Sequence, residues 1–505
     1  MNESLASEAA RLDMDQVKVD PAWALRVPAQ LATRRQVLPF ARRGDTVHVA
    51  CAAVDEATMQ AVRRFVQMTV RAELAEHGSL QRALQRTYGN AASRGGGVTP
   101  LIRQKTIDAR AASIDLDAED AVGLCDELLH AAILRQASDI HIDAERDGVV
   151  VRFRVDGVLE LYRELQPAAL AGLISRYKVL SGMDIAEKRA PQDGGFKHAY
   201  GPAGQAIDIR TATLPTRHGE RMTLRLLALQ TESLTLEKLG MSPGDLLRFQ
   251  WAIDQPHGMI LLTGPTGSGK TTTLYAAMRR LIGPRDQNVI TIEDPIEYEI
   301  AGVAQVEVDS ADKVSFGRAL RSVLRHDPDV LMIGEVRDAE TADVAVKASL
   351  TGHTVLSTLH TNSAPGAVTR LVDLGVARYL IASTLRLVAA QRLVRRLCSH
   401  CRRPRPLTQA EAGALGRPGI AGRTAYERSG CLYCADRGYS GRVGLFEMIA
   451  IDEDWARRIA GGADKPELYE MMRRHGVPSL MDDAADKVVE GVTSVPEALT
   501  AVSAW

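Results

Sequence analysis

Eight consecutive residues, Gly264 to Thr271, carry the clearest chemistry in the sequence. They match the pattern G-x-x-x-x-G-K-[ST] at every fixed position. Glycines let backbone N–H groups close around a polyphosphate, a lysine adds a point charge beside the β- and γ-phosphates, and a hydroxyl binds Mg²⁺. The pattern therefore predicts a site for ATP and Mg²⁺, rather than a plain glycine-rich turn. The expected nucleotide-binding residues are Gly264, Pro265, Thr266, Gly267, Ser268, Gly269, Lys270, Thr271 and Thr272, with Lys270 also catalytic and Thr271 on Mg²⁺.

Two acidic clusters follow apolar stretches further along the chain. The stretch DPDVLMIGE reads as an aliphatic strand that ends in Glu335. We expect this carboxylate to polarise the attacking water or to hold the water shell of the metal. The stretch TIEDPIEYE ends another strand in Glu293, Asp294 and Glu297, which are spaced for metal-shell contacts or water placement, with Glu297 also a catalytic candidate. The alternative for these three acids is a cluster that caps a helix.

A polar cluster ends the stretch TGHTVLSTLH. Its histidines, His353 and His360, are seven positions apart, so in an unbroken strand they face opposite sides and cannot share a metal. We interpret His360 as a candidate sensor of the γ-phosphate. The alternative is that both histidines are structural.

Four cysteines form two CxxC pairs separated by 29 residues, Cys398 with Cys401 and Cys431 with Cys434. Four thiolates complete a tetrahedral Zn²⁺ site and leave no open position for chemistry, so we predict structural zinc. A redox CxxC would occur once. A zinc ribbon can also be a DNA-binding element. The basic residues around it suit DNA, an acidic protein or anionic lipid equally. These residues are Arg392, Arg395, Arg396, Arg402, Arg403 and Arg405.

The residues named above need a scaffold, and the sequence from 236 to 395 predicts one. Short apolar strands such as MILLTG and PDVLMIGE alternate there with helical segments, which is typical of a parallel sheet with crossover helices. The polar residues that follow these strands would then meet at one edge of the sheet. We expect a multidomain α/β protein built around this core.

The rest of the chain divides at changes in composition, since 505 residues are too many for one hydrophobic core. The stretch AASRGGGVTP favours a flexible connector. Asp156-Gly157 predicts one hairpin turn, and a second hairpin follows at 205–227. Cys51 and Cys125 lie in apolar settings and are predicted to pack in cores. The predicted domains are 1–90, a small N-terminal α/β domain; 91–100, a linker; 101–235, an α+β domain; 236–395, the ATPase core; 396–437, an inserted tetracysteine zinc module; and 438–505, a helical region.

The composition excludes some classes of protein. Hydrophobic residues make up 45% and charged residues 25%, as in ordinary folded proteins, and the net charge of −1 gives no overall basic field for nucleic acid. No apolar run approaches the roughly 18 to 20 residues of a membrane-spanning helix. The N-terminus lacks the basic and apolar regions of a secretory signal, so we expect a cytoplasmic protein.

The order of the motifs carries a family resemblance. GPTGSGKT, IEDPIEYE, LRHDPDVLMIGEVRD and TGHTVLSTLHTN, with ASDIHID and VRFRVDGVL upstream, resemble the ring ATPases of the secretion superfamily, and especially the assembly ATPases of type II secretion. The resemblance implies a RecA-like P-loop core preceded by a PAS-like α+β domain. The four cysteines are similar to those of secretion and pilus-extension members, whereas pilus-retraction members generally lack them.

The resemblance also implies a hexamer in which arginines close on the nucleotide. An arginine finger can change the rate by about 10³ to 10⁵. Arg210 and Arg225 are the first candidates, and the sequence shows no obvious local partners for the arginines of the two hairpins. The remaining candidates are Arg217, Arg221, Arg321 and Arg325.

The expected function is that of a hexameric Mg-dependent ATPase on the cytoplasmic side of the inner membrane, which powers assembly of the type II secretion pseudopilus and export of folded proteins across the outer membrane. By the same resemblance, the N-terminal domain docks on the cytoplasmic domain of a bitopic inner-membrane protein, and a polytopic platform protein receives the motion. No nucleic acid is expected. The alternatives are a type IV pilus extension ATPase, a nucleic-acid motor, and a scaffold that binds ATP without hydrolysing it.

Overall fold

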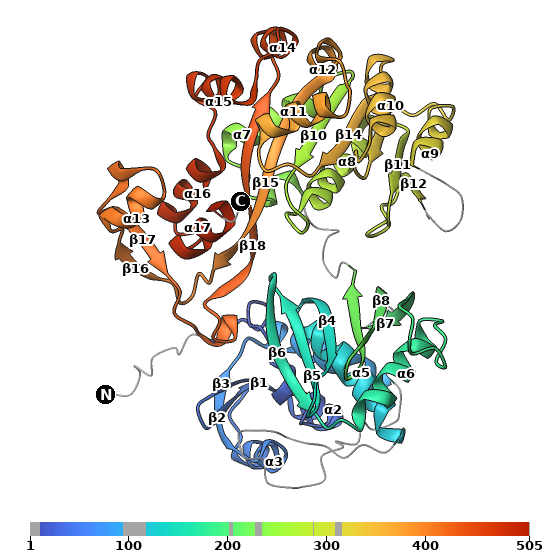
Figure 1. Cartoon of the computed structure of the whole chain (residues 1–505). Helices are drawn as coiled ribbons and strands as arrows, with labels where there is room; N and C mark the ends of the chain where they lie inside the picture. The colour runs from blue at the N-terminus through green and yellow to red at the C-terminus, as the bar shows by residue number, and fades with distance from the viewer. Residues whose placement is uncertain are drawn as a thin grey trace. The chain divides into compact units, whose positions relative to one another are not determined.

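The chain forms two compact units (Figure 1). The computed structural model describes residues 11–93, 118–200, 206–227, 235–285, 287–308 and 316–503. One unit comprises Met1–Leu229 with Ser429–Gly438, and the other Gln230–Arg428 with Tyr439–Trp505. Of the predicted linker 91–100, residues 94–100 lie outside the described residues. Within the described ranges, no helix is long and apolar enough to cross a membrane.

The first unit begins with a three-stranded sheet of order β1-β2-β3. A tight turn at Gly44 joins β1 (Val37–Arg43) to antiparallel β2 (Thr46–Cys51), and helix α3 (Glu56–Val66) crosses over to parallel β3 (Thr69–Leu74). The helices α1 (Pro21–Ala24), α2 (Ala29–Arg35) and α4 (His77–Ser93) complete this part. Cys51 is fully buried in its core, as predicted.

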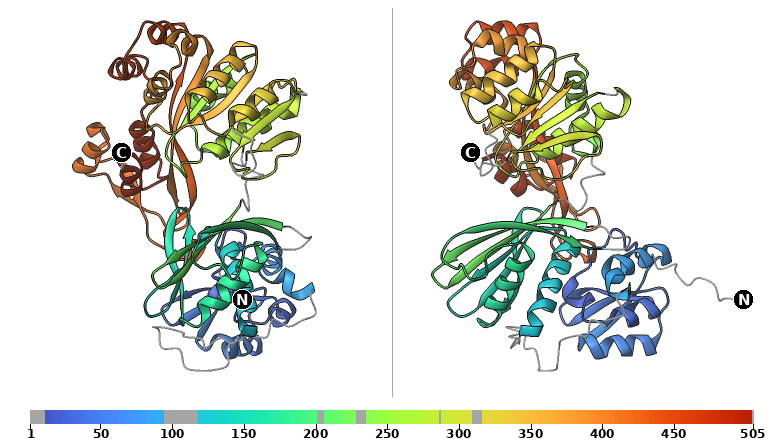
Figure 2. Two further views of the ribbon diagram at one scale, coloured as in Figure 1. Left: turned by 45° about the vertical axis from the view of Figure 1, so that its right-hand side comes forward. Right: turned by 90° about the vertical axis from the view of Figure 1, so that its right-hand side faces the viewer.

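A six-stranded antiparallel sheet of order β6-β5-β4-β9-β8-β7 forms the rest of the first unit. Both predicted hairpins are confirmed: Asp156 and Gly157 adopt positive φ between β5 and β6, and β8 pairs with β9 across residues 217 and 218. Helices α5 (Ala118–Leu134) and α6 (Ala169–Leu180) lie on one face (Figure 2), where Cys125 is fully buried as predicted. The strands are β4 (Ala137–Ala144), β5 (Val149–Val155), β6 (Val158–Leu165), β7 (Gln192–Ala199), β8 (Ala206–Thr216) and β9 (Gly219–Leu226).

The second unit contains the predicted parallel sheet, of order β12-β11-β13-β14-β10-β15-β18. All neighbours pair in parallel except β15 and β18, which are antiparallel. Helices cover both faces, so the central strands are buried along their whole length. The strands are β10 (Gly258–Thr263), β11 (Val289–Glu293), β12 (Val303–Glu307), β13 (Val330–Ile333), β14 (Thr354–Leu359), β15 (Leu385–Leu397) and β18 (Tyr439–Ala450).

The helices around this sheet are α7 (Pro243–Ile253), α8 (Lys270–Arg285), α9 (Phe316–Val323), α10 (Ala339–Leu350), α11 (Ala364–Asp373) and α12 (Arg378–Thr384). Between the CxxC pairs lie β16 (Arg403–Pro406), α13 (Gln409–Ala414), η3 (Pro418–Ile420) and β17 (Thr424–Glu427), and η4 (Leu432–Cys434) spans the second pair. The C-terminal helices are α14 (Glu453–Ala460), α15 (Lys465–Arg474), α16 (Leu480–Val489) and α17 (Val495–Ser503).

Two features differ from the expected domain plan. The prediction of a helical region over 438–505 does not hold for Tyr439–Ala450, because this stretch pairs with β15 and becomes the edge strand β18 of the central sheet. In addition, residues 429–437, predicted to lie in one module with 396–428, belong together with Gly438 to the first compact unit. There Arg43 forms an ion pair with Asp436, and the N–H of Lys18 donates to the carbonyl of Tyr433.

Candidate nucleotide site and cysteine cluster

The loop between β10 and α8 has the backbone conformation that its glycines permit. Gly264, Gly267 and Gly269 all adopt positive φ, and Lys270 begins the helix. A helix N-terminus combines N–H groups with the positive end of the helix dipole, which suits a phosphate. The hydroxyl of Ser268 is buried and has no hydrogen-bond partner. The loop therefore fits a polyphosphate both in shape and in chemistry.

Lys270 is buried and turns back onto the loop. Its Nζ donates to the carbonyl oxygens of Gly264 at 2.7 Å and Pro265 at 3.1 Å. Burial lowers the pKa of Lys270 to about 8, with Glu335 opposing and Arg392 adding to the shift. A phosphate placed in the loop would compensate this poorly solvated charge. Thr271 follows on the first turn of α8, where its hydroxyl would hold Mg²⁺, and Thr272 comes next.

The predicted acid Glu335 lies just beyond the end of β13, at the same sheet edge as the loop. One of its carboxylate oxygens accepts from Arg337, and the other lies 2.8 Å from Nε2 of His360. Burial raises the pKa of Glu335, but the hydrogen bonds from Arg337 and His360 outweigh it, so that this pKa lies below its usual value. A carboxylate held ionised in this way can accept a hydrogen bond from water.

The three acids after β11 occupy different settings. Glu293 is buried, and its carboxylate accepts from Tyr275, from Thr291 at 2.6 Å and from Gln305 at 3.1 Å. Asp294 is exposed and lies 3.5 Å from Arg337. The backbone N–H of Glu297 donates to the Tyr275 hydroxyl at 3.4 Å. The carboxylate of Glu293 is thus used in hydrogen bonds to neighbouring side chains. Contacts of the three acids with the water shell of a metal stay predictions.

The two histidines are separated, but they flank β14 at its two ends and do not face opposite sides within one strand. His360 follows β14 and contacts Glu335, at the edge where the loop lies. His353 precedes β14, and its Nδ1 lies 2.8 Å from the carbonyl of Ala348, at the end of α10. His353 is therefore structural, whereas a sensing role of His360 is still a prediction.

Sequence reasoning missed the residues that support this site. Arg337 contacts both Glu335 and Asp294, and Tyr275 holds Glu293 from helix α8. Gln391 and Arg392, on β15, are buried beside the loop. Arg337 could have been found from the sequence, because it follows Glu335 by two positions. Nothing in the apolar pattern of β15 distinguishes Gln391 and Arg392.

The candidate arginines of the first unit lie on the outer face of its larger sheet. Arg210 and Arg225 are directly opposite each other on β8 and β9. The sequence shows no obvious local partners for the hairpin arginines, but the structure pairs Arg225 with Asp139 at 3.2 Å and Arg221 with Asp143 at 3.0 Å, both on the adjacent strand β4. These arginines belong to the first unit and the loop to the second, so their role at the nucleotide is still a prediction.

The remaining arginine candidates lie elsewhere. Arg217 is in the turn between β8 and β9. Arg321, on α9, forms an ion pair with Glu340, and Arg325 donates to the carbonyl of Arg321 at 3.2 Å. Arg321 and Arg325 therefore have local structural contacts, and a role at the nucleotide is still a prediction for both.

The four cysteines come together. The sulfur atoms of Cys398, Cys401, Cys431 and Cys434 all lie within 4.8 Å of one another. Those of Cys431 and Cys434 are 3.7 Å apart, and zinc–sulfur bonds of about 2.3 Å give a tetrahedral edge of about 3.8 Å. Backbone N–H groups of Cys431 and Gly438 donate to the Cys434 sulfur at 3.3 and 3.2 Å. The donor set fits a closed Zn²⁺ site.

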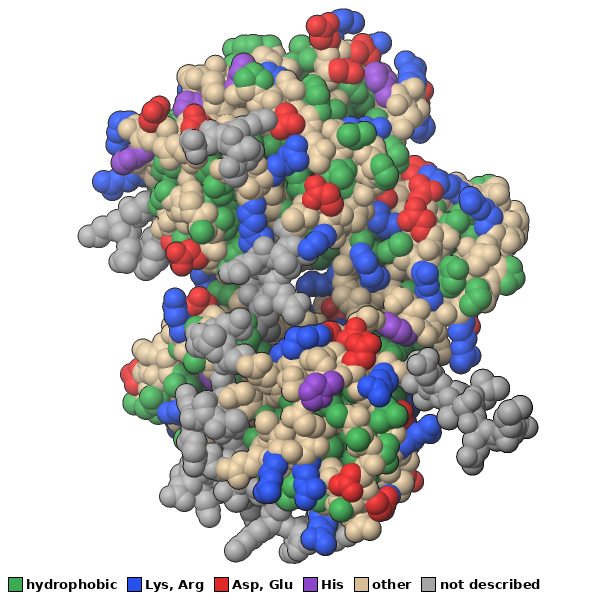
Figure 3. Space-filling model, turned by 180° about the vertical axis from the view of Figure 1, so that it is seen from behind, with side chains coloured by type: hydrophobic (Ala, Val, Ile, Leu, Met, Phe, Trp, Pro, Cys, Tyr) green, Lys and Arg blue, Asp and Glu red, His purple; other side chains and the backbone are tan. Residues whose placement is uncertain are grey.

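Three of the six arginines predicted to surround this cluster are paired with acids or buried. Arg392 is buried away from solvent, Arg395 pairs with Glu497, and Arg405 pairs with Glu411. Figure 3 shows acidic and basic side chains interspersed on the face in view, among the residues described there. Arg396 and Arg403 are exposed, so the partner that a basic surface here would meet stays a prediction.

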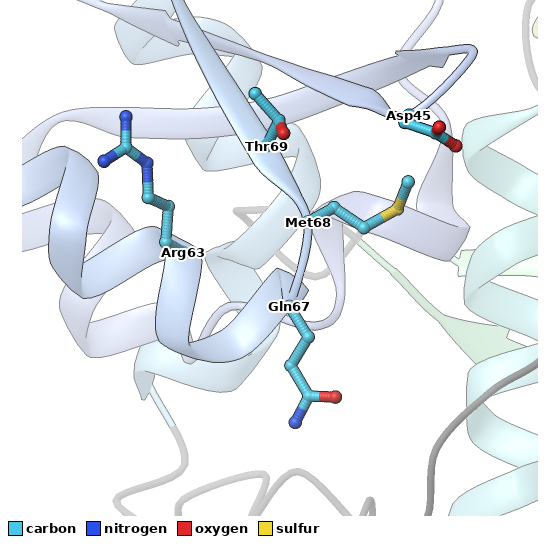
Figure 4. A pocket seen from close by; sticks show the side chains of 5 residues that line it. All are labelled: Asp45, Arg63, Gln67, Met68 and Thr69. Carbon is cyan, nitrogen blue, oxygen red and sulfur yellow. The ribbon is translucent and has the colours of Figure 1, made fainter.

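A hollow on the N-terminal sheet does not compete with the nucleotide site. Figure 4 shows that its side chains point in different directions rather than converging, and Asp45 is fully exposed. A ligand site needs polar groups that converge on one position. The residues lining the hollow are Asp45, Arg63, Gln67, Met68 and Thr69.

The glycine-rich loop between β10 and α8 lies at the same sheet edge as Glu335, whose carboxylate is hydrogen-bonded by Arg337 and His360. This combination defines a P-loop nucleotide-binding protein. The family model for Type II/IV secretion system proteins matches residues 116–500, and the MshEN domain model matches residues 8–94. The chain therefore belongs to the Type II/IV secretion system protein family.

Individual relatives agree with this assignment. The chain is 42% identical over 490 residues to Type II secretion system protein E of Klebsiella pneumoniae, covering 93% of this chain and 97% of that one. It is 37% identical over 498 residues to the type IV pilus assembly ATPase PilB of Thermus thermophilus, covering 97% of this chain and 55% of PilB. The fold is similar to that of the pilus retraction motor PilT with bound ADP, with a TM-score of 0.51 at 26% identity over 74% of this chain and 94% of PilT.

Proposed function

We propose that this protein is a Mg-dependent ATPase that powers assembly of the type II secretion pseudopilus, and through it the export of folded proteins across the outer membrane. One observation carries the enzymatic part: the P-loop with Lys270 and the ionised carboxylate of Glu335 lie at the same edge of one sheet. The similarity to secretion protein E along almost the whole length of both chains supports the biological part.

The chain's own residues suggest how hydrolysis proceeds. The P-loop would bind the phosphates, with Lys270 leaving the loop carbonyls for the β- and γ-phosphates and Thr271 holding Mg²⁺, which neutralises developing charge. Glu335 would orient the attacking water, and His360 and Arg337 fix the direction of its carboxylate. Asp294 and Glu297 would place water around the metal.

Hexamer formation and arginines acting between subunits form the next part of the proposal. Arg210 and Arg225 lie opposite each other on one sheet face, where two guanidinium groups could approach the same phosphate, although Arg225 also pairs with Asp139. Mixing a Lys270→Ala chain with an Arg225→Ala chain tests this arrangement. Each variant alone is expected to be inactive, and the mixture regains ATPase activity if Arg225 serves a neighbour's nucleotide. A mixture as inactive as its components contradicts action between subunits.

The membrane partners also stay proposals. The N-terminal domain, matched by the MshEN model, would dock on the cytoplasmic domain of a bitopic inner-membrane protein, and a polytopic platform protein would receive the motion. The protein would thus associate peripherally with the cytoplasmic side of the inner membrane. A chain without residues 1–90 that still fractionates with membranes contradicts the docking role.

The deciding experiment is a chromosomal Lys270→Ala substitution, with secreted enzymes and surface pili measured in the same cells. Retention of enzymes in the periplasm with pili unchanged supports type II secretion. Loss of pili with normal secretion supports the second candidate, a type IV pilus extension ATPase, which the similarity to PilB favours. Stimulation of ATP hydrolysis by DNA would indicate a nucleic-acid motor instead, and a silent Glu335→Gln substitution would indicate a non-hydrolysing scaffold.

A further inference from the structure

Arg392 is a buried cation that forms no ion-pair contact with an acid among the described residues, although the charge of Glu447 acts on it. Its side chain is 5% exposed, and Nη1 and Nη2 donate to the carbonyl oxygens of Gln391 at 3.0 Å and Asn362 at 3.1 Å. Its Nε has no hydrogen-bond partner, and no carboxylate among the described residues lies within 4.0 Å of the guanidinium. Burial lowers the pKa of Arg392, and the charge of Glu447 offsets this only in part, so packing alone does not explain an arginine at this position.

The position of Arg392 follows from the pairing of β15 with β10. Thr263, the last residue of β10, pairs with Ala390, so Gln391 and Arg392 come directly after the level at which β10 becomes the P-loop. A Cβ atom on Gly264 would lie 2.5 Å from the Gln391 carbonyl oxygen and 3.1 Å from Arg392 Nη1. The guanidinium therefore lies directly against the first glycine of the P-loop.

Gln391 supports the same loop from its other end. Its Oε1 accepts from the hydroxyl of Thr273 at 2.9 Å, and its Nε2 would lie 2.9 Å from a Cβ atom on Gly269. Two consecutive polar residues of β15 thus contact the beginning and the end of the P-loop. This contact restricts how far the loop can shift when it binds and releases phosphate.

The second contact of Arg392 leads to the catalytic acid. Asn362, whose carbonyl accepts from Nη2, comes two residues after His360, which contacts Glu335. The hydroxyl of Thr263 adds a parallel link, because it accepts from the N–H of Thr361 at 2.8 Å. One guanidinium therefore joins the P-loop to the segment that orients Glu335.

We infer that Arg392 is a positioning residue for ATP hydrolysis, which holds the P-loop and the segment His360–Asn362 at a fixed distance so that the Glu335 carboxylate is set against the phosphates. This inference rests on the ATPase activity proposed above. Because a displacement of about 1 Å can lower a rate by about 10²-fold, loss of this link affects turnover more than nucleotide binding.

The test compares Arg392→Lys and Arg392→Met with Arg396→Met in the full-length chain. Arg396 is the matched control, since it is exposed on the same strand. We expect kcat to fall about 10- to 100-fold for Arg392→Met and less for Arg392→Lys, which retains the charge, with KM for ATP within about threefold of wild type. Arg396→Met is expected to behave as wild type.

Two outcomes contradict this inference. A kcat within twofold of wild type in Arg392→Lys and Arg392→Met contradicts it, and so does a parallel loss of ATP binding and melting temperature in both, which indicates a purely structural role. If Arg392→Met fails to fold, Arg392→Lys carries the test. If the wild-type protein itself hydrolyses no ATP under these conditions, the proposed function fails rather than this inference.

A double mutant gives an independent readout. If Arg392 acts through the His360 segment, adding Arg392→Lys to His360→Ala lowers kcat little further than His360→Ala alone, because both changes disturb the same contact. Fully multiplicative losses show that the two residues act separately and contradict the proposed link.

Discussion

The P-loop and the cysteine cluster differ in whether their buried polar groups have hydrogen-bond partners. Beside the P-loop, the Ser268 hydroxyl and Arg392 Nε are buried without hydrogen-bond partners, and Lys270 donates to backbone carbonyls. In the cysteine cluster, two backbone N–H groups already donate to the Cys434 sulfur, and all four ligand atoms have converged.

This difference separates a site that exchanges its ligand from one that keeps it. A buried donor without a partner is unfavourable, so part of the binding free energy of a phosphate would come from satisfying the Ser268 hydroxyl. Four thiolates around one zinc leave no position for water or substrate. Substitutions beside the P-loop should therefore change turnover, whereas those in the cluster should change metal content and stability.

Of the substitutions at the nucleotide site, Glu335→Gln is expected to have the largest effect. We expect ATP hydrolysis to fall by about 10²- to 10⁴-fold, because the amide cannot take up a proton from water, while ATP binding is retained. Single-turnover assays and binding of a fluorescent ATP analogue measure the two quantities. Glu490→Gln, at an exposed position of the same unit, serves as the control. Substantial turnover by Glu335→Gln would assign the base to another residue.

Cys434→Ser tests the prediction that the cysteine cluster holds its metal permanently. Serine lacks the thiolate that zinc prefers, so we expect zinc content to fall at least tenfold and the melting temperature to drop, since metal binding contributes directly to folding. Metal analysis of the purified chain provides the measurement. Cys51→Ala removes a thiol buried in another core and should leave the zinc content unchanged. Full zinc content in Cys434→Ser contradicts a four-cysteine site.

Both sites were visible in the sequence because their key residues stand at fixed short spacings. The P-loop pattern, the CxxC pairs, the acid after an aliphatic strand and the parallel sheet all depend on local order, and the structure agrees with each. The two histidines are also far apart, but this is because they lie at opposite ends of β14 and not on its two faces.

What sequence reasoning missed depends on pairing between distant strands. The partners of Arg221 and Arg225 lie on β4, about 80 residues away along the chain, and only the register of β4 with β9 brings them together. Arg392 was interpreted as part of a basic surface, but its pairing level beside β10 buries it at the P-loop. Strand register is set by the packed sheet and cannot be read from one strand alone.

His360→Ala is expected to have a smaller effect, because it removes an orienting contact and leaves the carboxylate in place. We expect kcat to fall about tenfold with KM for ATP nearly unchanged. His353→Ala is the matched control, since its ring contacts the end of α10 instead. A strong loss of ATP binding in His360→Ala would show that the histidine contacts the nucleotide directly, and equal effects in the two variants would contradict a specific role.

Glu411→Gln gives the smallest expected effect and asks how much the segment between the CxxC pairs depends on local charge. Glu411 accepts from Arg405 and caps α13 together with Thr408, and these hydrogen bonds lower its pKa to about 2, with the Arg405 contact the largest cause. Glutamine preserves the cap, so the substitution removes mainly the ion pair. At neutral pH we expect a loss of about 0.5 kcal/mol in the free energy of unfolding, since the pair is partly solvent-exposed.

The pH dependence of that loss has a defined sign. A carboxylate with a depressed pKa stabilises the folded state fully above its unfolded pKa, near 4.5, and this contribution disappears as pH falls towards 2. The difference between wild type and Glu411→Gln in urea unfolding should therefore be constant from pH 7 to pH 6 and should narrow below pH 4.5. Glu427→Gln, which faces Arg405 at 3.7 Å from a more exposed position, should cost less. A loss above about 2 kcal/mol would mean that local charge, rather than the cysteine cluster alone, holds this segment together.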